Sequence, residues 1–476
     1  MKKVDLIILI FILTIGLLLR LYKLNIPLAD LHSWRQADTA SVARNFVKNG
    51  FDLLHPKYDD LSNVQSGIDN PQGFRMVEFP IYNALIAASY KAFPTMPLER
   101  WGRLISIVFS LVTILVIYLI LLKEKGRISA FFAGLIYAVF PFFVYFSRIV
   151  LPEPMALGFV ALSVFFLYQG DTKHVARYTL YVILSLIFFS LSLLIKPTTI
   201  FFALPLIYIM VRNHRLRILK NPLFYIYFLL AILPIFIWRN YIRLFPEGIP
   251  VNEWLITSVN TGGSLQRIYF RPSFFRWIFF ERINNLILGG YLSVFMLLGI
   301  MIKQKGFFLH SFLLASLAYL FVFQGGNVQH EYYQILILPS LAIFTALGID
   351  FLFQKKNTSL FSYAFLALPL LLIFSWYFSY VKVKDYYQYS QELIKEAKVL
   401  NDLTKPGDKI VTDRIGDTTL LYLADRKGAP SIFKEPYELS KLGYKYLITS
   451  NKDQIGRMLS EYKIVFENEK FTLFAL

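Results

Sequence analysis

The sequence predicts a polytopic α-helical membrane protein with a small α/β domain after its last apolar run. Of its 476 residues, 56% are hydrophobic and only 17% are charged, and many apolar runs reach or approach the length that spans a bilayer. We expect about eleven spans, and about thirteen at most. The first run is expected to remain as a helix, because it is longer than a signal-peptide core and no cleavage motif follows it. The apolar runs lie near residues 4–22, 101–122, 128–147, 152–170, 178–195, 197–211, 223–238, 284–302, 308–323, 334–353 and 359–380.

The net charge of +18 follows the predicted topology rather than a nucleic-acid surface. Residues 381–476 hold 16 Lys and Arg against 14 Asp and Glu, so the excess belongs to the first 380 residues, with 33 against 17. If the N-terminus is cytoplasmic, Lys and Arg gather in the inner loops, which is the positive-inside pattern. We therefore expect a lipid bilayer, and no nucleic acid, as the partner of this surface.

This topology places three large segments on the outer, extracytoplasmic face: residues 23–100, residues 239–283 and everything after residue 380. The segment 239–283 mixes Pro, Gly and aromatic residues and is too long for a simple connection, so its TGGSLQR stretch is predicted to close over a substrate.

Residues 384–476 form the predicted α/β domain. SQELIKEAKVLNDLT, TTLLYLADR, YELSKLG and DQIGRMLSEY are expected to be helices, DKIVTD and YKYLITS strands, and KIVFENEKFTLFAL a hairpin. The domain either contacts an acceptor or caps the membrane part, and the sequence leaves both open.

The stretch LADLHSWRQADTASVARNF contains two aspartates, a histidine, a tryptophan and two arginines, which a simple connecting loop does not need. SWRQ has the pattern of a capping box formed by Ser33 and Gln36, which predicts a helix from Trp34 to Lys48 that stops at Gly50. Its apolar residues would give one side suited to the membrane surface.

Asp38 lies just past the first turn of this helix. There the helix dipole favours the ionised carboxylate. The structural alternative is an i, i+3 salt bridge between Asp38 and Arg35 on a solvated helix face.

Cations at the outer face are candidates for binding a phosphate, since they neutralise negative charge. Arg148 and Lys196 each stand alone where a span meets the outer surface, and the alternative interpretation of both is snorkelling to the headgroups. The Pro and two Thr after Lys196 predict a broken helix. Further outer cations are Arg239, Arg267, Arg271 and His330.

A second unusual outer turn is GGNVQHEYYQILILP. Its His330, Glu331 and Tyr332 are candidates for a donor pocket, and an aromatic belt at the interface is the structural alternative. Without cysteine, a divalent metal would need His and carboxylate ligands. His330 with Glu153 or Asp38 is compatible with such a site, although no ligand spacing singles it out.

Several short motifs in the first 210 residues occur in an order typical of one enzyme family. They are Asp38-Thr39 followed by Ala43-Arg44, then Glu78-Phe79-Pro80-Ile81-Tyr82, then Arg103, then Ser147-Arg148, and then Pro152-Glu153. This pattern resembles glycosyltransferase family 39, the dolichyl-phosphate-mannose protein mannosyltransferases and lipid A aminoarabinose transferases, which have the GT-C membrane fold. The chain departs from the family pattern at Thr39, Glu78 and Glu153, which replace an acid, a His and an Asp.

The resemblance implies an inverting glycosyltransferase of the plasma (inner) membrane. It would move a single sugar from a polyprenyl-phosphate carrier to a hydroxyl of a lipid, glycan or protein acceptor on the outer face. Asp38 is the better match to the catalytic carboxylate, with Glu153 as a second catalytic residue. The expected donor-phosphate site contains Arg148, Lys196, Arg239 and His330. The expected substrate pocket contains Asp30, His32, Trp34, Arg35, Glu78, Tyr82, Glu331 and Tyr332, and Asp30 is also the alternate catalytic aspartate.

Two other classes of protein share parts of this pattern. A lipid-linked oligosaccharide transferase or ligase uses the same carrier but transfers a glycan chain. A flippase or transporter would also be polytopic and basic, but it usually has inverted repeats and ionisable residues near the midplane. Here the spans are almost free of charge, and the polar groups gather on one face.

Overall fold

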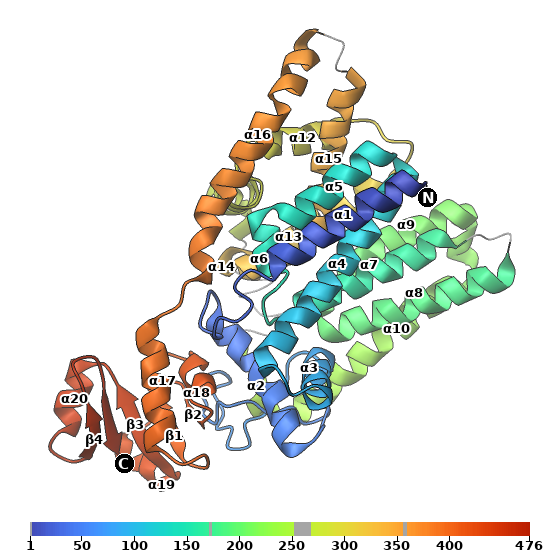
Figure 1. Cartoon of the computed structure of the whole chain (residues 1–476). Coiled ribbons are helices and arrows are strands. Elements are labelled where there is room, and N and C mark those ends of the chain that lie inside the picture. The colour runs from blue at the N-terminus through green and yellow to red at the C-terminus, as the bar shows by residue number, and fades with distance from the viewer. Residues whose placement is uncertain (1, 171–173, 252–267, 356–358) are drawn as a thin grey trace. The chain divides into compact units, whose positions relative to one another are not determined.

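The computed structural model describes residues 2–170, 174–251, 268–355 and 359–476, and it divides into two compact units. The first unit comprises Met1–Leu24, Arg103–Trp238 and Leu255–Tyr386, and the second comprises Asn25–Gly102, Arg239–Trp254 and Tyr387–Leu476. Both units therefore combine segments that lie far apart in the sequence, as the colours of Figure 1 show.

The first unit is helical throughout its described part, and every predicted apolar run coincides with one or more helices. Among the described residues, five helices have the length and composition to cross a membrane, or six if the bent pair Pro272–Ile287 and Leu292–Met301 is one span. The predicted number of about eleven spans stays a prediction. The helices are α1 (Lys3–Arg20), α4 (Leu98–Glu124), α5 (Arg127–Val139), α6 (Pro141–Phe146), α7 (Glu153–Gln169), α8 (Val175–Ile195), η1 (Pro197–Phe202), α9 (Ala203–His214), η2 (Arg215–Lys220), α10 (Pro222–Tyr241), η6 (Ile268–Phe270), α11 (Pro272–Phe275), η7 (Arg276–Ile287), α12 (Leu292–Met301), α13 (Phe308–Val322), α14 (Gln324–Gln329), η8 (Glu331–Ile337), α15 (Leu338–Lys355) and α16 (Ser359–Val383).

A buried arginine ties α1 to the end of α5 and the end of α6. Arg20 is fully buried, and its guanidinium donates to the carbonyls of Ala138 and Tyr137, both at 2.9 Å. These carbonyls belong to the last turn of α5, where helical partners are missing, and Pro141 at the start of α6 offers no N–H. The Arg20 Nε also donates to Ser147 Oγ at 2.7 Å. One side chain thus fixes the turn that follows α6.

The second unit contains the α/β domain, and most of its predicted elements are present. Strand β2 was not predicted, and the helix expected over TTLLYLADR is only the short α18. The elements are α2 (Ser33–Asn49), α3 (Ile81–Ala92), η3 (Ile242–Leu244), η4 (Pro246–Gly248), η9 (Lys384–Tyr387, which begins in the first unit), α17 (Gln391–Leu403), β1 (Lys409–Thr412), α18 (Thr419–Leu423), β2 (Lys427–Ala429), α19 (Pro436–Lys441), β3 (Tyr444–Thr449), α20 (Lys452–Met458), β4 (Lys463–Glu467) and β5 (Thr472–Ala475).

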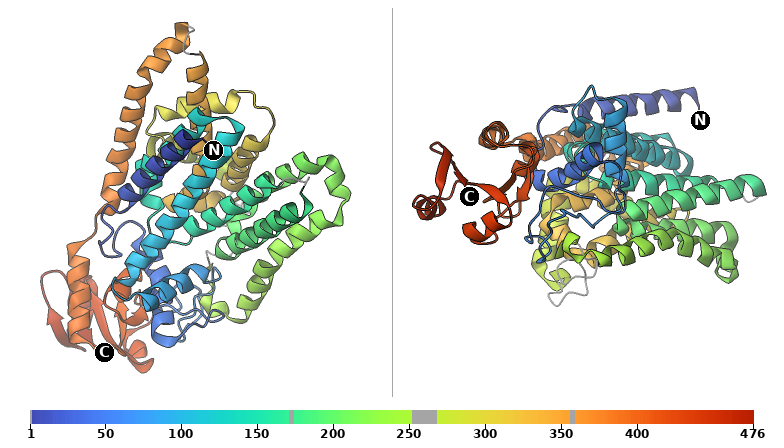
Figure 2. Two further views of the ribbon diagram at one scale, coloured as in Figure 1. Left: turned by 45° about the vertical axis from the view of Figure 1, so that its right-hand side comes forward. Right: turned by 90° about the horizontal axis from the view of Figure 1, so that it is seen from below.

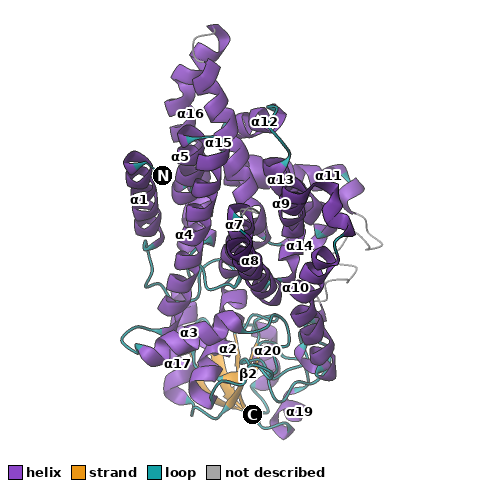
Figure 3. Ribbon diagram, turned by 90° about the vertical axis from the view of Figure 1, so that its right-hand side faces the viewer, coloured by secondary structure: helices purple, strands orange, loops and turns teal. Residues whose placement is uncertain are grey.

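The strands form a mixed sheet in the order β2-β1-β3-β5-β4. β1 is parallel to β2 and β3, whereas β5 is antiparallel to both β3 and β4. Alternating side chains give the sheet an apolar cluster on each face. Leu400 and Leu421 bring α17 and α18 onto one face, and Leu439 and Met458 bring α19 and α20 onto the other. Helices therefore cover both sides of the strands (Figures 2 and 3).

The β2 edge of the sheet is closed by a segment from the loop between α2 and α3. The N–H of Gly428 donates to the carbonyl of Asp59 at 2.9 Å, and the N–H of Leu61 donates to the carbonyl of Gly428 at 2.7 Å. Asp60 and Gly428 form a parallel bridge. An open edge would expose unpaired backbone groups, so this pairing explains why residues 25–102 and 387–476 belong to one compact unit.

Gly428→Ala is expected to destabilise the second unit. A Cβ at this position would lie 1.7 Å from the carbonyl oxygen of Ile410, so β2 would have to move away from β1. Overpacking of this kind costs about 1–3 kcal/mol or more, and the melting temperature of the purified protein in detergent should fall by several degrees. Gly407→Ala is the control, because a Cβ there meets no atom within 4 Å. An unchanged melting temperature for Gly428→Ala would contradict the pairing.

Candidate functional site

Helix α2, which carries Asp38, has nearly the predicted bounds but a different beginning. It ends at Asn49, and Gly50 follows with φ of 90°, as expected. The predicted capping box is wrong. His32 is the N-cap residue, with φ of 57°, and the Gln36 amide donates to Asp30 Oδ1 at 2.8 Å instead of reaching back to the cap. The Gln36 side chain therefore holds the loop before the helix, and it does not cap the helix.

The prediction that α2 buries a single apolar side is also wrong, whereas its place at the membrane surface stays a prediction. Polar residues such as Arg35, Gln36 and Asn45 are buried along with the apolar Ala40 and Phe46. The reason is that α3 and α18 of the same unit pack against α2. The helix is thus an internal element of the second unit.

Asp38 is 1% exposed, and its two carboxylate oxygens have different surroundings. Thr418 Oγ1 donates a hydrogen bond to Oδ1 at 2.7 Å. Arg75 Nη2 lies 3.1 Å from Oδ2, yet Oδ2 accepts no hydrogen bond from the described part of the chain. Oδ1 therefore accepts a hydrogen bond from a neutral hydroxyl, whereas Oδ2 lies beside a cation and keeps its lone pairs free of hydrogen bonds from the described residues.

The i, i+3 salt bridge between Asp38 and Arg35 does not form. Arg35 pairs instead with Glu78, another residue of the predicted pocket, through Nη2 and Oε1. The cation beside Asp38 is Arg75, which the sequence analysis missed. No periodic or motif signal marks Arg75, because it reaches Asp38 through the folding of a loop.

A tight turn presents Arg75 to Asp38. Gly73 has φ of 66°, a conformation that favours glycine, and a Cβ there would lie 2.9 Å from the carbonyl oxygen of Tyr58. The Asn70 side chain closes the turn by bonding the N–H and the carbonyl of Phe74, each at 2.9 Å. The Arg75 N–H donates to the carbonyl of Pro56 at 2.8 Å, which fixes the backbone next to the guanidinium.

Burial raises the pKa of Asp38 above its ordinary value, while Arg75, the Thr418 hydroxyl and Arg35 act to lower it and Asp417 acts to raise it. The helix dipole and Arg35 were expected to keep this carboxyl ionised and only modestly basic, and desolvation outweighs their effect on its pKa. A carboxylate with a raised pKa is a better proton acceptor than an exposed aspartate.

A second buried carboxyl lies in the same unit. Asp60 accepts hydrogen bonds from the N–H and hydroxyl of Ser62 at 2.8 and 2.6 Å and from the Tyr58 hydroxyl at 3.3 Å. Burial is the main cause that raises the pKa of Asp60 to about 7, and the charge of Asp38 adds to this effect.

The first unit contains its own buried ion pair. Glu153 is the first residue of α7, and Lys196 follows the end of α8. Lys196 Nζ lies 2.7 Å from Glu153 Oε1, and the two side chains are 6% and 1% exposed. The ammonium also lies 5.4 Å from the centre of the Tyr333 ring. The predicted broken helix after Lys196 is confirmed by η1, which begins at Pro197, and the snorkelling interpretation of Lys196 is wrong.

Arg148 does not snorkel either. It is fully buried, and its Nη2 donates to the carbonyl of Lys23 at 2.8 Å. Arg103 makes a parallel contact, with Nη1 donating to the carbonyl of Leu24 at 2.7 Å. Two arginines of the first unit thus hold the backbone that follows α1.

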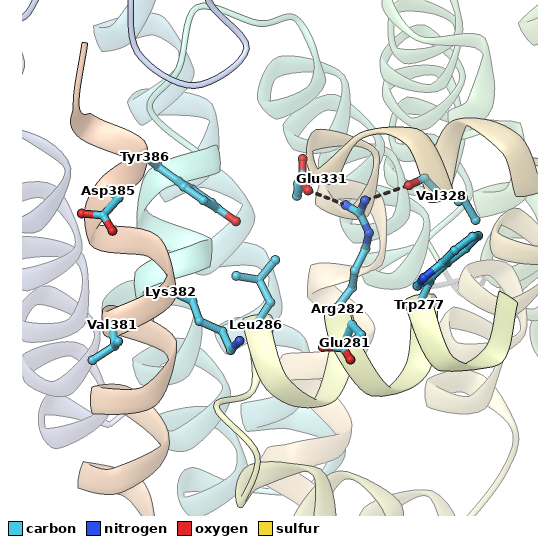
Figure 4. A pocket seen from close by; sticks show the side chains of 10 residues that line it. All are labelled: Trp277, Glu281, Arg282, Leu286, Val328, Glu331, Val381, Lys382, Asp385 and Tyr386. Atoms are coloured by element: carbon cyan, nitrogen blue, oxygen red, sulfur yellow. Dashed lines mark hydrogen bonds and ion pairs between the residues drawn. The ribbon is translucent and has the colours of Figure 1, made fainter. Parts of the chain in front are cut away.

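A cavity of about 660 Å³ lies in the first unit beside Glu331 (Figure 4). Arg282 lines this cavity, 3.3 Å from Glu331 Oε1, and donates to the carbonyl of Val328 at 2.8 Å. Arg282 comes from η7, a π-helix, a geometry that recurs at functional sites. The sequence analysis missed Arg282, which lies just ahead of a predicted span. The lining residues are Trp277, Glu281, Arg282, Leu286, Val328, Glu331, Val381, Lys382, Asp385 and Tyr386.

The other predicted site residues have varied surroundings. Tyr82 is buried and donates its hydroxyl to the carbonyl of Gly102 at 2.8 Å. His330 stacks on Tyr332 with ring centres 5.4 Å apart. Trp34 is half-buried, and Arg239 lies in the last turn of α10. Arg267 and the TGGSLQR stretch lie outside the described residues, whereas Arg271 is the N-cap residue of α11.

Within the described ranges, no three His, Asp or Glu side chains gather as a metal would require. The predicted combination of His330 with Glu153 or Asp38 gains no further ligand from this part of the chain. Roles in donor or acceptor binding remain predictions for all of these residues.

Solved structures of other proteins share this fold. The crystal structure of ArnT from Cupriavidus metallidurans bound to undecaprenyl phosphate has a TM-score of 0.67 at 13% identity, covering 98% of this chain and 97% of that chain. The oligosaccharyltransferase AglB from Archaeoglobus fulgidus, in complex with an inhibitory peptide and a dolichol-phosphate, has a TM-score of 0.57 at 14% identity, covering 94% and 69%. The chain has the GT-C fold of multi-pass membrane glycosyltransferases.

The family model described as dolichyl-phosphate-mannose-protein mannosyltransferase matches residues 77–238. This range contains Glu78, Arg103, Arg148 and Glu153, which are among the residues that carry the resemblance to glycosyltransferase family 39, whereas Asp38 and Arg44 lie outside it. The resemblance is confirmed by this match. Among curated protein sequences, none matches this chain.

The raised pKa of Asp60 predicts a pH-dependent stability. Because the folded protein binds this proton more tightly than the unfolded chain, the contribution of Asp60 is present in full below the ordinary Asp pKa near 4 and is lost as the pH rises through about 7. Asp60→Asn should therefore reduce the fall in melting temperature between pH 5 and 7.5. Asp402→Asn, at an exposed position, is the control. Equal pH dependence in wild type and Asp60→Asn would refute the assignment.

Proposed function

We propose that this protein is an inverting glycosyltransferase that moves a single sugar from a polyprenyl-phosphate carrier to an acceptor hydroxyl. The observation that carries the proposal is the buried Asp38 carboxylate, whose Oδ1 is held by Thr418 while Oδ2 faces Arg75 without accepting a hydrogen bond from the described residues. The fold shared with ArnT bound to undecaprenyl phosphate supports the choice of carrier.

In the proposed reaction, Asp38 Oδ2 takes the proton from the acceptor hydroxyl as that oxygen attacks the anomeric carbon of the sugar. The bond between this carbon and the phosphate oxygen breaks, and the phosphate leaves with the electron pair on the opposite side. The anomeric configuration is therefore inverted. A positioned carboxylate suits the first event, and cations suit the second, because they stabilise the negative charge that the phosphate gains.

The phosphate of the donor is proposed to bind in the first unit at Lys196 and Arg148, next to Glu153. Glu153 and Lys196 form a buried ion pair, and a phosphate would compete with Glu153 for the lysine. The cavity around Arg282 and Glu331 is proposed to receive a polar part of a substrate, since it combines cations, carboxylates and the Tyr386 ring. The extracytoplasmic face is assigned from the positive-inside pattern.

A lipid-linked oligosaccharide transferase is the second candidate function. The observation that favours it is the shared fold with the Archaeoglobus fulgidus oligosaccharyltransferase, also solved tethered to an acceptor peptide, with a TM-score of 0.59 at 13% identity and coverage of 94% and 69%. The mass added to the acceptor separates the two functions, because one predicts a single sugar and the other a glycan chain.

Asp38→Asn is expected to abolish transfer. The substitution keeps the shape of the side chain and removes its basicity, so turnover should fall roughly a hundredfold or more, as for other positioned proton acceptors. A strain that lacks the gene should accumulate a lipid-linked sugar and lose one surface glycan, and both changes can be followed by mass spectrometry. The wild-type gene should restore the glycan, and Asp38→Asn should not.

Asp30→Asn is the matched control, since Asp30 is also a buried aspartate at the start of α2. It should reduce transfer far less than Asp38→Asn, and Glu153→Gln should fall between the two. Full transfer by Asp38→Asn with no transfer by Asp30→Asn would show that Asp30, and not Asp38, is the catalytic aspartate.

Arg148→Gln and Lys196→Gln should each raise the concentration of lipid-linked sugar needed for half-maximal transfer. The physical reason is the loss of a cation that neutralises the phosphate. Transfer is measured in proteoliposomes supplied with the accumulated donor from the deletion strain. Arg212→Gln is the control, because Arg212 pairs with Glu124 in a partly exposed contact. If both variants keep wild-type donor dependence, these residues have only a structural role.

A further inference from the structure

The α/β domain contacts helix α2 through its short helix α18. Thr419 Oγ1 donates to Ser33 Oγ at 2.9 Å, and the Tyr422 hydroxyl donates to Glu99 Oε1 at 2.6 Å. Arg44 Nη1 donates to the carbonyl of Tyr422 at 2.6 Å, with its guanidinium 4.2 Å from the centre of that ring. These contacts bring the beginning of α18 next to Asp38.

Thr418 is the N-cap residue of α18, but its side chain does not cap the helix. An N-cap threonine ordinarily accepts a hydrogen bond from the backbone of the first turn. Here Asp417 Oδ1 accepts from the N–H of Thr419 at 2.8 Å, and the hydroxyl of Thr418 points to Asp38 Oδ1 at 2.7 Å. Thr418 is 2% exposed. The domain thus directs a buried donor toward the carboxylate rather than toward its own helix.

We infer that Thr418 is a positioning residue that orients Asp38 for proton transfer, so that the α/β domain forms part of the active site. This inference rests on the proposed function. A hydrogen bond from Thr418 occupies Oδ1 and fixes the rotation of the carboxylate. Oδ2, which faces Arg75 and accepts no hydrogen bond from described residues, is then the oxygen that takes the proton.

The charged and titratable groups around Asp38 in this unit define how Thr418 acts. Arg75 and Arg35 favour the carboxylate, and Asp417 and Asp60 disfavour it. The Thr418 hydroxyl favours the charged form without adding a charge. Replacing it with the isosteric Val keeps the packing and removes only the donor, so protonation of Asp38 should then begin at a higher pH.

The test compares Thr418→Val, Thr418→Ser and Thr419→Val in the full-length protein. Thr418→Val should lower maximal transfer about tenfold without changing the donor dependence, and should move the acid limb of the pH–rate profile up by about one pH unit, the size expected for a hydrogen bond to a charge. Thr418→Ser should restore both. Thr419→Val loses the contact with Ser33 but should leave the acid limb in place. Transfer is measured in proteoliposomes that contain the total lipid extract of the deletion strain.

A second measurement needs no substrate. Dicyclohexylcarbodiimide reacts with protonated carboxyl groups, so labelling of Asp38, followed by peptide mass spectrometry across a pH series, reports its protonation directly. Thr418→Val should move the labelling midpoint upward by about one pH unit, and Thr418→Ser and Thr419→Val should not.

The two measurements separate the possible failures. An unmoved midpoint and an unmoved acid limb in Thr418→Val would overturn the positioning role and leave Asp38 as the base. A moved midpoint together with full transfer by Asp38→Asn would overturn the proposed base, and the positioning role with it. Equal losses in Thr418→Val and Thr419→Val without any shift would assign α18 a purely structural role and overturn the inference.

Discussion

A charge removed from water must be compensated by other groups of the protein. In the second unit, one buried charge that needs such partners is the carboxylate of Asp38. Its partners come from two parts of the chain, Arg75 in the loop that follows α2 and Thr418 in the α/β domain. Removing one partner of a buried ion pair typically costs about 3–5 kcal/mol. The hydrogen bond from Thr418 and the pairing of Gly428 with Asp59 and Leu61 both join residues 25–102 to residues 387–476 within this unit.

The first unit meets the same requirement in a different way. Glu153 at the start of α7 and Lys196 at the end of α8 neutralise each other, whereas Arg20 and Arg148 donate hydrogen bonds to backbone carbonyls. Carbonyls in the last turn of a helix carry partial negative charge and lack internal partners. Arginine, with five donors, can serve several of them at once. Buried cations that pair with a carboxylate and buried cations that donate to carbonyls thus look alike in the sequence.

Apolar periodicity and helix signals were enough to predict the helices of the membrane part and most of the α/β domain, because both depend on local sequence. The break after Lys196 followed from Pro197 in the same way. Long-range partners could not be predicted. Arg75 reaches Asp38 through a glycine turn, and Thr418 reaches it from 380 residues away. The capping box failed because Gln36 has a competing acceptor in Asp30, a tertiary contact that a local pattern does not contain.

Desolvation and hydrogen bonding act on Asp38 in opposite directions, and a proton acceptor needs both. Burial alone would leave the carboxyl protonated and unable to accept a proton, whereas strong pairing alone would make it too weak a base. Arg75 and Thr418 share the compensation between a cation and a neutral donor, so neither oxygen carries a full bidentate ion pair. The site therefore holds a buried carboxylate whose Oδ2 accepts no hydrogen bond from the described residues. Because the neutral donor comes from the α/β domain, the basicity of Asp38 depends on how that domain is folded against α2.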